Sequence, residues 1–218
     1  MEMFNDYMLL ASCDKSTGRV VTIGNFDGVH LGHRKVINRC QGISRTESLD
    51  FAVCTFEPHP AEFFMRKPKL RLVTPAKKIR LMAQLGVDTV LAQNFDMAFA
   101  SLDAREFVQK VLVDALKAKI VVVGEDFRFG KGRKGNVNLL RELGSGLGFE
   151  VLGVDLHTKA DEAISSSRIR KLLLEGKVSE AARIIGRNHQ VPGEVVKGHR
   201  AGSTMGKDTI VFKREALS

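Results

Sequence analysis

The feature that most constrains this chain is an alternation of short β-branched runs with stretches of helical period, from residue 19 to about residue 186. The runs typical of strands are 19–24, 49–56, 87–93, 119–124 and 149–155. The stretches with apolar residues at helical spacing are 31–43, 74–86, 102–116, 136–148 and 165–186. Strands that alternate with helices of this length indicate a parallel sheet. We therefore expect an α/β fold, a Rossmann-like parallel sheet of about five strands with helices on both faces.

Two of the expected helices carry further local signals. The stretch 74–86 opens with Thr74 at the N-cap and Pro75 at the first helical position, and Gly86 is its stop. The stretch 102–116 places Phe107, Val111 and Ala115 on one stripe, which predicts core packing rather than a cofactor site.

Composition restricts the class of protein. A chain of 218 residues with 44% hydrophobic and 27% charged residues is typical of one globular domain with, at most, an appendage. It lacks the run of about 18 apolar residues that a membrane span requires, so we expect no membrane partner. The first ten residues include Glu2 and Asp6 and no basic region, which argues against a secretory signal. The three cysteines, Cys13, Cys40 and Cys54, predict reduced thiols and a cytoplasmic location.

The net charge of +9 allows a nucleic-acid partner, a site that holds several phosphates, or merely a solvated basic surface. The charge is scattered, and one Tyr with no Trp gives little to stack bases on. We therefore expect no nucleic-acid partner.

The most informative segment is VTIGNFDGVHLGHRKVI, residues 21–37, where an expected strand passes through three glycines into a helix. Its spacing fits neither the dinucleotide fingerprint nor a Walker loop. Glycine permits close approach of backbone to a ligand, and free amides at a helix start bind anions. His30 and His33, three residues apart on the first helical turn, point the same way and can donate hydrogen bonds to phosphate.

These residues also carry a family resemblance. GNFDGVHLGH resembles the first signature of the HxGH nucleotidyltransferases, and its G-x-F-D-G-x-H-x-G-H form is similar to that of the bacterial FAD synthetases. Three further stretches agree with that family in order and spacing, and the resemblance covers about residues 18–186. They are FEPHP at 56–60, VGEDFRFGKGRKG at 123–135 and ISSSRIR at 164–170.

The resemblance implies an FMN adenylyltransferase, which makes FAD and pyrophosphate from ATP and FMN. The catalytic residues that it implies are His30, His33, Ser166, Ser167 and Arg170. The ATP-binding residues that it implies are Gly24, Phe26, Asp27, Gly28, Gly32 and Ser165. The flavin-binding residues that it implies are Phe56, Pro58, Asp126, Phe127, Arg128 and Phe129. The glycine-rich stretch 126–135 is expected to form a mobile flap anchored by Phe127 and Phe129, and His59 receives no chemical role.

The chemistry of such a reaction fits these residue types. Attack of one phosphate on another brings two polyanions together, so catalysis consists mainly of positioning and charge neutralisation. A nucleophilic Ser or Cys is unnecessary, because the substrate phosphate is the nucleophile. The expected cofactor is Mg²⁺, with no protein metal site, because substrate phosphates would hold the ion.

The C-terminal part departs from the family pattern. From 187 the chain is rich in glycine and β-type residues, and GEVVKGHRAGSTMGKDTIVF (193–212) resembles the opening of the riboflavin kinase module that most bacterial relatives carry. Lys207-Asp208 replace the Phe-Pro of its nucleotide-binding tetrad, Thr209 is kept, and Val211 replaces the Asn. We expect residues 1–186 to form the nucleotidyltransferase domain and 187–218 a truncated, degenerate kinase-like stub. A separate riboflavin kinase or imported FMN is then implied.

Three other functions remain open from sequence. A sister nucleotidyltransferase could act on another phosphorylated substrate, but 56–60 and 126–130 resemble the flavin enzymes. A non-catalytic flavin or nucleotide carrier would not need the intact His30 and His33. A basic nucleic-acid-binding protein would lose affinity steeply with salt.

Overall fold

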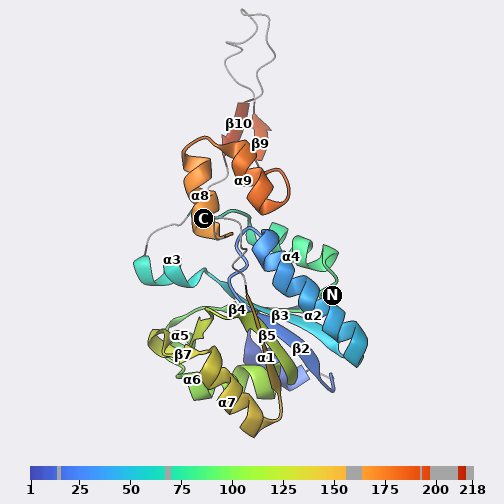
Figure 1. The fold of residues 1–218 in the computed structure, drawn as a ribbon. Coiled ribbons are helices and arrows are strands. Elements are labelled where there is room, and N and C mark those ends of the chain that lie inside the picture. Colours follow the sequence, from blue (N-terminus) through green and yellow to red (C-terminus); the bar gives the residue numbers. More distant parts are fainter. Residues whose placement is uncertain (14–15, 67–69, 156–163, 192, 197–210, 215–218) are drawn as a thin grey trace, which may run out of the picture.

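The computed structural model describes residues 1–13, 16–66, 70–155, 164–191, 193–196 and 211–214. Its centre is a six-stranded, all-parallel sheet in the order β1-β4-β3-β2-β5-β8 (Figure 1). The strands of this sheet are β1 (Glu2–Phe4), β2 (Arg19–Ile23), β3 (Asp50–Glu57), β4 (Thr89–Asn94), β5 (Ala118–Gly124) and β8 (Glu150–Val154). The α/β class and the parallel sheet are therefore confirmed.

The number of strands differs from the expected five. The additional strand is β1, whose residues Glu2–Phe4 pair with Thr89–Leu91 of β4 at the edge of the sheet. Three residues show no recognisable alternation, and their partner lies more than eighty positions away in the sequence. This strand therefore depends on a long-range contact that a local pattern does not reveal.

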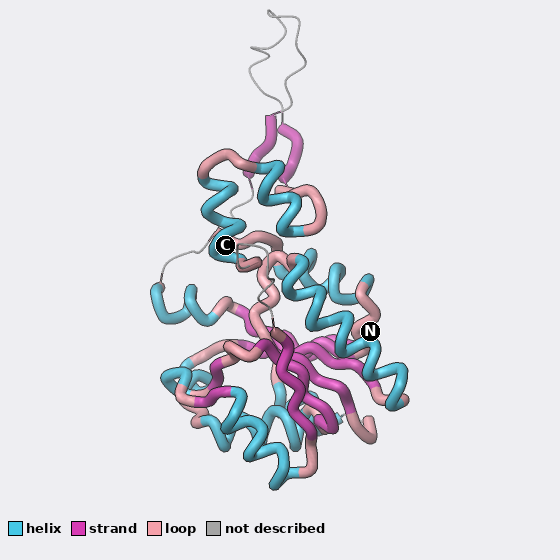
Figure 2. Tube along the Cα trace, viewed as in Figure 1, coloured by secondary structure: helices cyan, strands magenta, loops and turns pink. Residues whose placement is uncertain are grey.

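Helices cover both faces of the sheet, as predicted. α2 (Leu31–Glu47) and α4 (Pro75–Gln84) pack on one face with the buried side chains of a first core cluster. α1 (Tyr7–Cys13), the π-helix η1 (Val108–Ala115) and α7 (Val137–Leu147) pack on the other face. The tube in Figure 2 shows these two layers with the strands, in magenta, between them.

The predicted helix signals are largely confirmed. The Thr74 hydroxyl accepts from the Lys77 amide at 3.3 Å, and Pro75 is the first residue of α4. The stripe of Phe107, Val111 and Ala115 is buried in the core. The expected single helix over 102–116 is instead a short α6 (Ala104–Phe107) that continues as the π-helix.

Smaller elements complete the main fold. They are α3 (Pro60–Met65), α5 (Met97–Ala100), the strands β6 (Arg128–Phe129) and β7 (Gly135–Asn136), the 3₁₀ turn η2 (Lys131–Arg133), α8 (Ser166–Leu174) and α9 (Val178–Ile185). α8 and α9 share a third core cluster with Leu72, formed by Ile169, Leu172, Ala181 and Ile185. Figure 1 shows this helical pair beyond the carboxyl ends of the strands.

The C-terminal segment contains an antiparallel pair, β9 (Gly193–Val196) and β10 (Val211–Arg214). Lys207, Asp208 and Thr209 lie outside the described residues. In the part of the chain that the structure describes, no helix is long and apolar enough to cross a bilayer. Of the three free cysteines, Cys40 and Cys54 are buried and Cys13 is exposed.

Candidate functional site

The glycine turn, residues 24–33, leaves the carboxyl end of β2 at the point where the strand order reverses. From β2 the chain builds β3 and then β4 on one side, and it returns to place β5 and then β8 on the other side. In open parallel sheets, ligands bind in the crevice outside such a reversal. The topology therefore places the most informative sequence segment where a site is expected.

The backbone of the glycine turn is strained. Phe26, Gly28 and Val29 have positive φ angles of 49°, 86° and 40°. Gly28 is required on two counts, because a Cβ at this position would also lie 2.9 Å from Leu72 Cδ1. A β-branched residue such as Val29 rarely adopts a positive φ, and residues held this way cluster at ligand sites.

His30 and His33 lie side by side at the start of α2, as their spacing predicts. The two rings stack with centroids 3.6 Å apart and planes 15° apart. His30 is the N-cap of α2, and its Nδ1 accepts from the His33 amide at 3.3 Å. Because Nδ1 accepts, a neutral His30 carries its proton on Nε2. His30 can therefore donate a hydrogen bond while it caps its own helix.

Both imidazoles are held neutral. Burial, followed by the charges of Arg187 and Arg170, lowers the pKa of His30 from 6.5 to about 4. The pKa of His33 is lowered well below its usual value by burial first, then by His30 and Lys78. The buried His33 Nδ1 has no hydrogen-bond partner among the described residues. Two neutral imidazoles can supply donors for phosphate oxygens near neutral pH.

The start of α8 lies against the glycine turn. The Ser165 hydroxyl caps α8 by accepting from the Arg168 amide at 3.2 Å. The Ser166 hydroxyl donates to the Asp27 carbonyl at 2.9 Å, and Arg170 forms a buried ion pair with the Asp27 carboxylate. The fold thus brings the N-termini of α2 and α8 to the same loop, a favourable place for a polyanion. The remaining serine of the motif, Ser167, is exposed.

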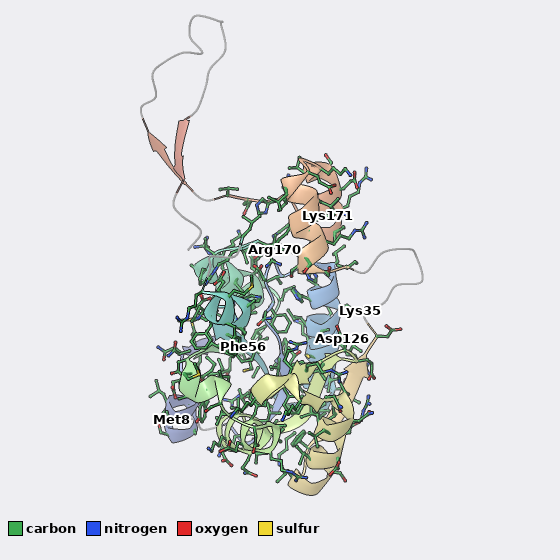
Figure 3. The ribbon with its side chains drawn as sticks, turned by 90° about the vertical axis from the view of Figure 1, so that its left-hand side faces the viewer. Met8, Lys35, Phe56, Asp126, Arg170 and Lys171 are labelled. Carbon is green, nitrogen blue, oxygen red and sulfur yellow. The ribbon has the colours of Figure 1, made fainter. Side chains whose placement is uncertain are left out.

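Three of the flavin-binding residues expected from sequence, Phe56, Phe127 and Phe129, are joined by a chain of rings. Phe56 at the end of β3 contacts Phe99, with ring centroids 5.8 Å apart. Phe99 contacts Phe107 at 6.1 Å, Phe107 contacts Phe129 at 5.6 Å, and Phe129 stacks on Phe127 at 5.5 Å. This chain of rings connects the end of β3 to the segment that follows β5. Figure 3 shows Arg170 at the start of the helical pair, with Phe56 and Asp126 nearer the sheet.

The glycine-rich stretch after β5 is folded. β6 and β7 pair as a small antiparallel ladder in which Arg128 opposes Asn136 and Phe129 opposes Gly135. The Phe129 ring is buried in the main core, whereas Asp126 and Arg128 are exposed. Phe129 therefore anchors this stretch to the core, and whether the stretch moves as a flap stays a prediction.

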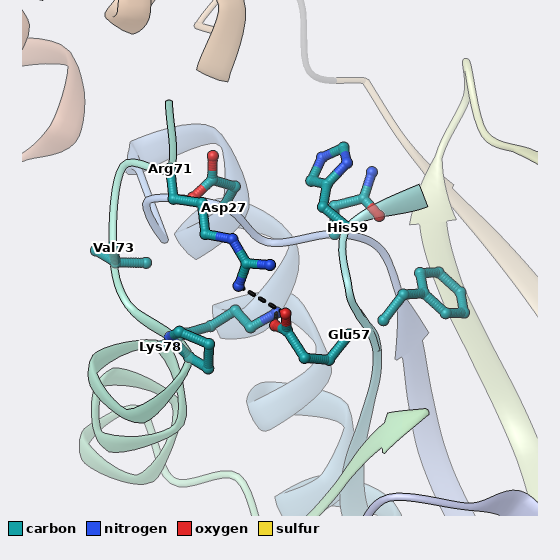
Figure 4. Close-up of a pocket in the computed structure, with 9 residues that line it drawn as sticks. Asp27, Glu57, His59, Arg71, Val73 and Lys78 are labelled. Carbon is teal, nitrogen blue, oxygen red and sulfur yellow. Dashed lines mark ion pairs between the residues drawn. The ribbon is translucent and has the colours of Figure 1, made fainter. Parts of the chain in front are cut away.

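A polar pocket beside the turn contains charges that are mostly neutralised (Figure 4). Arg71 pairs with Glu57 at 2.6 Å and with Glu62 at 2.6 Å. Lys78 is buried and donates to the Thr55 hydroxyl at 3.0 Å, and burial lowers its pKa. The residues lining this pocket are Asn25, Asp27, Phe56, Glu57, His59, Arg71, Val73, Pro75 and Lys78. His59 caps α3 by accepting from the Ala61 amide at 3.0 Å, and Pro58 follows a cis peptide bond.

Sequence reasoning missed several residues of this region, including Lys78 and Phe99. Lys78 lies three and four positions before Leu81 and Met82, so it is a cation on the apolar stripe of a helix. That position was a usable signal for a buried lysine. Phe99 offered no such signal, because its place between Phe56 and Phe107 depends on the tertiary fold.

Comparison with known proteins identifies the family. The model of the FAD synthetase family matches residues 13–168. A bifunctional riboflavin kinase/FMN adenylyltransferase from Buchnera aphidicola is 38% identical over 197 residues, covering 89% of this chain and 63% of the relative. The protein of the same name from Escherichia coli K12 is 39% identical over 193 residues, covering 88% of this chain and 62% of the relative. The chain thus spans less than two thirds of the length of these curated relatives.

A solved structure agrees with these sequence matches. A crystal structure from Streptococcus pneumoniae, described as a macrolide-efflux protein, superposes with a TM-score of 0.80 at 30% identity. It covers 91% of this chain and 65% of that protein. With the family match extending over most of the crevice residues, the resemblance seen in the sequence is confirmed, and this chain belongs to the FAD synthetase family.

Proposed function

We propose that this chain is an FMN adenylyltransferase, which transfers AMP from ATP to FMN and releases pyrophosphate. The observation that carries the proposal is the convergence of the two helix N-termini and the stacked His30–His33 pair on one strained turn. Family membership supports the same activity. The site offers many hydrogen-bond donors for phosphate. The reaction needs no protein nucleophile, because a phosphate oxygen of FMN attacks.

The ATP triphosphate would lie across the glycine turn. The amides of Gly28 and Gly32, the His30 Nε2 and the first turn of α8 would donate to its oxygens. Asp27 would not contact the phosphates, because Arg170 and the Leu72 amide engage its carboxylate. Its role would be to hold the turn against α8.

The transfer would proceed directly. A phosphate oxygen of FMN forms a bond to the α-phosphorus of ATP, and the bond between that phosphorus and the oxygen of the leaving pyrophosphate breaks. His30, His33 and the backbone amide of Ser166 would stabilise the negative charge that grows on the transferred and leaving groups. Inversion at a chiral α-phosphorothioate is the expected result, and retention would contradict direct transfer.

Magnesium fits this site as a partner of the substrate. The described residues contain no group of three or more His, Cys, Asp or Glu side chains arranged to hold a metal ion. Since Asp27 is paired with Arg170, the triphosphate oxygens would be the main ligands of Mg²⁺. When bound, the ion would neutralise phosphate charge.

The flavin would lie on the aromatic side of the crevice. Phe56, Pro58 and Phe127 would border its ring system, and the exposed Asp126 and Arg128 would reach its polar edge. Phe129, buried in the core, would support this surface from below.

We also propose that this chain has no riboflavin kinase activity, so its FMN would come from a separate kinase or from import. The proposal rests on Lys207-Asp208 and Val211, which replace residues of the kinase nucleotide-binding tetrad. It treats 187–218 as a degenerate stub beside the 1–186 transferase domain.

One assay tests both proposals. The pure protein is incubated with ATP, Mg²⁺ and either FMN or riboflavin, and the flavins are separated by chromatography. FAD formed from FMN and no FMN or FAD formed from riboflavin is the expected result. Failure to form FAD from FMN would contradict the transferase, and flavin co-purifying with such an inert protein would favour a carrier.

A further inference from the structure

Arg187, the second residue after α9, reaches back to the glycine turn. Its Nη2 donates to the carbonyl of Gly28 at 2.6 Å, and its Nη1 donates to the carbonyl of Val29 at 3.2 Å. These partners are 159 and 158 positions away in the sequence. A planar guanidinium presents two donors in a rigid fork that fits two neighbouring acceptors, whereas an ammonium lacks this fixed geometry. The Arg187 side chain therefore links the end of α9 to two backbone carbonyls of the turn.

The two carbonyls belong to the strained part of the turn. Gly28 and Val29 have φ angles of 86° and 40°, and such conformations persist where the surroundings hold them in place. The carbonyl of Val29 also accepts from Arg34 Nε at 3.4 Å, a longer contact from α2 itself. Arg187 is thus the side chain that both carbonyls share, and it comes from a different element.

The local fold brings Arg187 to this position. Gly186 ends α9 with a φ of 78°, and a Cβ there would lie 2.5 Å from Leu31 Cδ2. Ala181 and Ile185 anchor α9 in the third core cluster. The end of α9 consequently packs on the first turn of α2, directly beside His30.

We propose that Arg187 is a positioning residue for adenylyl transfer, which holds the carbonyls of Gly28 and Val29 and thereby fixes the turn and His30 in the geometry that binds the triphosphate. The inference rests on the proposed function and extends the site beyond the motifs found in the sequence. Its positive charge also opposes protonation of His30.

The test compares three variants. Arg187→Ala removes both hydrogen bonds, Arg187→Lys keeps the charge without the fork, and Arg183→Ala removes an equal charge from the exposed side of α9 as a matched control. We expect the KM for ATP to rise by about 30-fold in the Ala variant and by about 10-fold in the Lys variant. The KM for FMN is expected to stay within about two-fold, and R183A is expected to match the original chain.

ATP binding measured by calorimetry without flavin gives a second readout. The Kd for Mg·ATP is expected to rise in parallel with the KM, and added guanidinium is expected to restore part of the binding of R187A. Circular dichroism establishes that each variant is folded. If R187A does not fold, R187K decides the question.

Specific results would overturn the inference. A folded R187K with the original Kd for ATP, or equal rises of the KM for ATP and for FMN in R187A, would show that Arg187 is not a positioning residue for the triphosphate. Failure of the proposed function has a different signature, because the unaltered chain would then make no FAD from FMN.

Discussion

The glycine-turn side and the aromatic side of the proposed site differ in the residue types that form them. On one side, the glycine turn is strained and polar, and long-range hydrogen bonds hold it to α8 and to the end of α9, among them Ser166 to Asp27 and Arg187 to Gly28. On the other side, rings from Phe56 to Phe127 form a continuous apolar chain. The first arrangement suits charge, which needs fixed donors, and the second suits a flat apolar ring. Under the proposed function, the polar side would receive the triphosphate and the aromatic side would receive the flavin.

The largest effect is expected from breaking the buried ion pair on the polar side. Arg170→Ala leaves the Asp27 carboxylate buried without its cation, which is expected to lower the free energy of unfolding by about 3–5 kcal/mol. Urea denaturation measures this loss. Lys171→Ala, at an exposed position of the same helix, is expected to change it by less than about 0.5 kcal/mol.

A combined variant separates the pair from the packing around it. Neutralising both partners, with Asp27→Asn and Arg170→Met, is expected to recover part of the lost stability, because no uncompensated charge remains. If the double variant were as unstable as Arg170→Ala alone, the ion pair would not be the cause.

The next effect separates chemistry from structure at His30. His30→Asn keeps a side chain that can cap α2 but removes the Nε2 donor. We expect kcat/KM for FAD formation to fall by about 10²–10³-fold, as when one donor to a developing charge is removed. Steady-state kinetics measure the loss, and thermal unfolding close to that of the original chain confirms that the cap is kept. Activity within a few-fold of the original would exclude His30 from catalysis.

A pH effect of about 3 kcal/mol is expected from the same histidine. The pKa of His30 is about 4 in the folded chain against 6.5 as its ordinary value, so the unfolded state binds more protons between these pH values. The stability contributed by neutral His30 is therefore complete above pH 6.5 and is lost as the pH falls toward 4. The groups that face the histidine pair are Arg170, Arg187 and Lys78.

Comparing pH profiles isolates this contribution. Unfolding free energies measured from pH 7 to pH 4 are expected to fall less steeply for His30→Asn than for the original chain. His33, whose pKa is also lowered, would account for slope that remains in the variant. Identical slopes for the two proteins would mean that His30 is not held neutral by the fold.

The smallest effect is expected on the aromatic side. Phe56→Ala removes the half-buried ring at the end of the ring chain, which is expected to raise the KM for FMN by about ten-fold. The KM for ATP is expected to stay unchanged, because the residues proposed to bind the triphosphate lie in the glycine turn and at the start of α8. Phe56→Leu keeps apolar area but has no ring, so its KM for FMN is expected to lie between those of the original chain and Phe56→Ala. A rise in the KM for ATP instead would contradict the assignment of ATP and FMN to separate sides of the site.

The sequence predicted what depends on local patterns. The strand-and-helix alternation predicted the parallel sheet, Thr74 and Pro75 predicted the start of α4, and His30 and His33 were expected to lie together. Each of these signals lies within one element or at one turn, where spacing and residue type suffice.

The remainder depended on contacts between distant segments. The three-residue strand β1 forms because it can pair with the edge of β4. The apolar stripe of η1 has the same spacing as in an α-helix, so it does not predict π-helical hydrogen bonding. The pairing of Arg170 with Asp27 spans 143 positions, and the contact of Arg187 with Gly28 spans 159. A local pattern identifies such residues as polar and says nothing of their partners.

The most direct test of the two-sided crevice is a backbone NMR titration of the labelled protein, first with Mg·ATP alone and then with FMN. ATP is expected to shift the amide signals of residues 24–33 and of Ser165–Ser167, and FMN is then expected to shift those near Phe56 and Phe127. If ATP instead shifted the signals near Phe56 and Phe127 and left residues 24–33 unchanged, the assignment of phosphate to the strained turn and flavin to the ring chain would be contradicted.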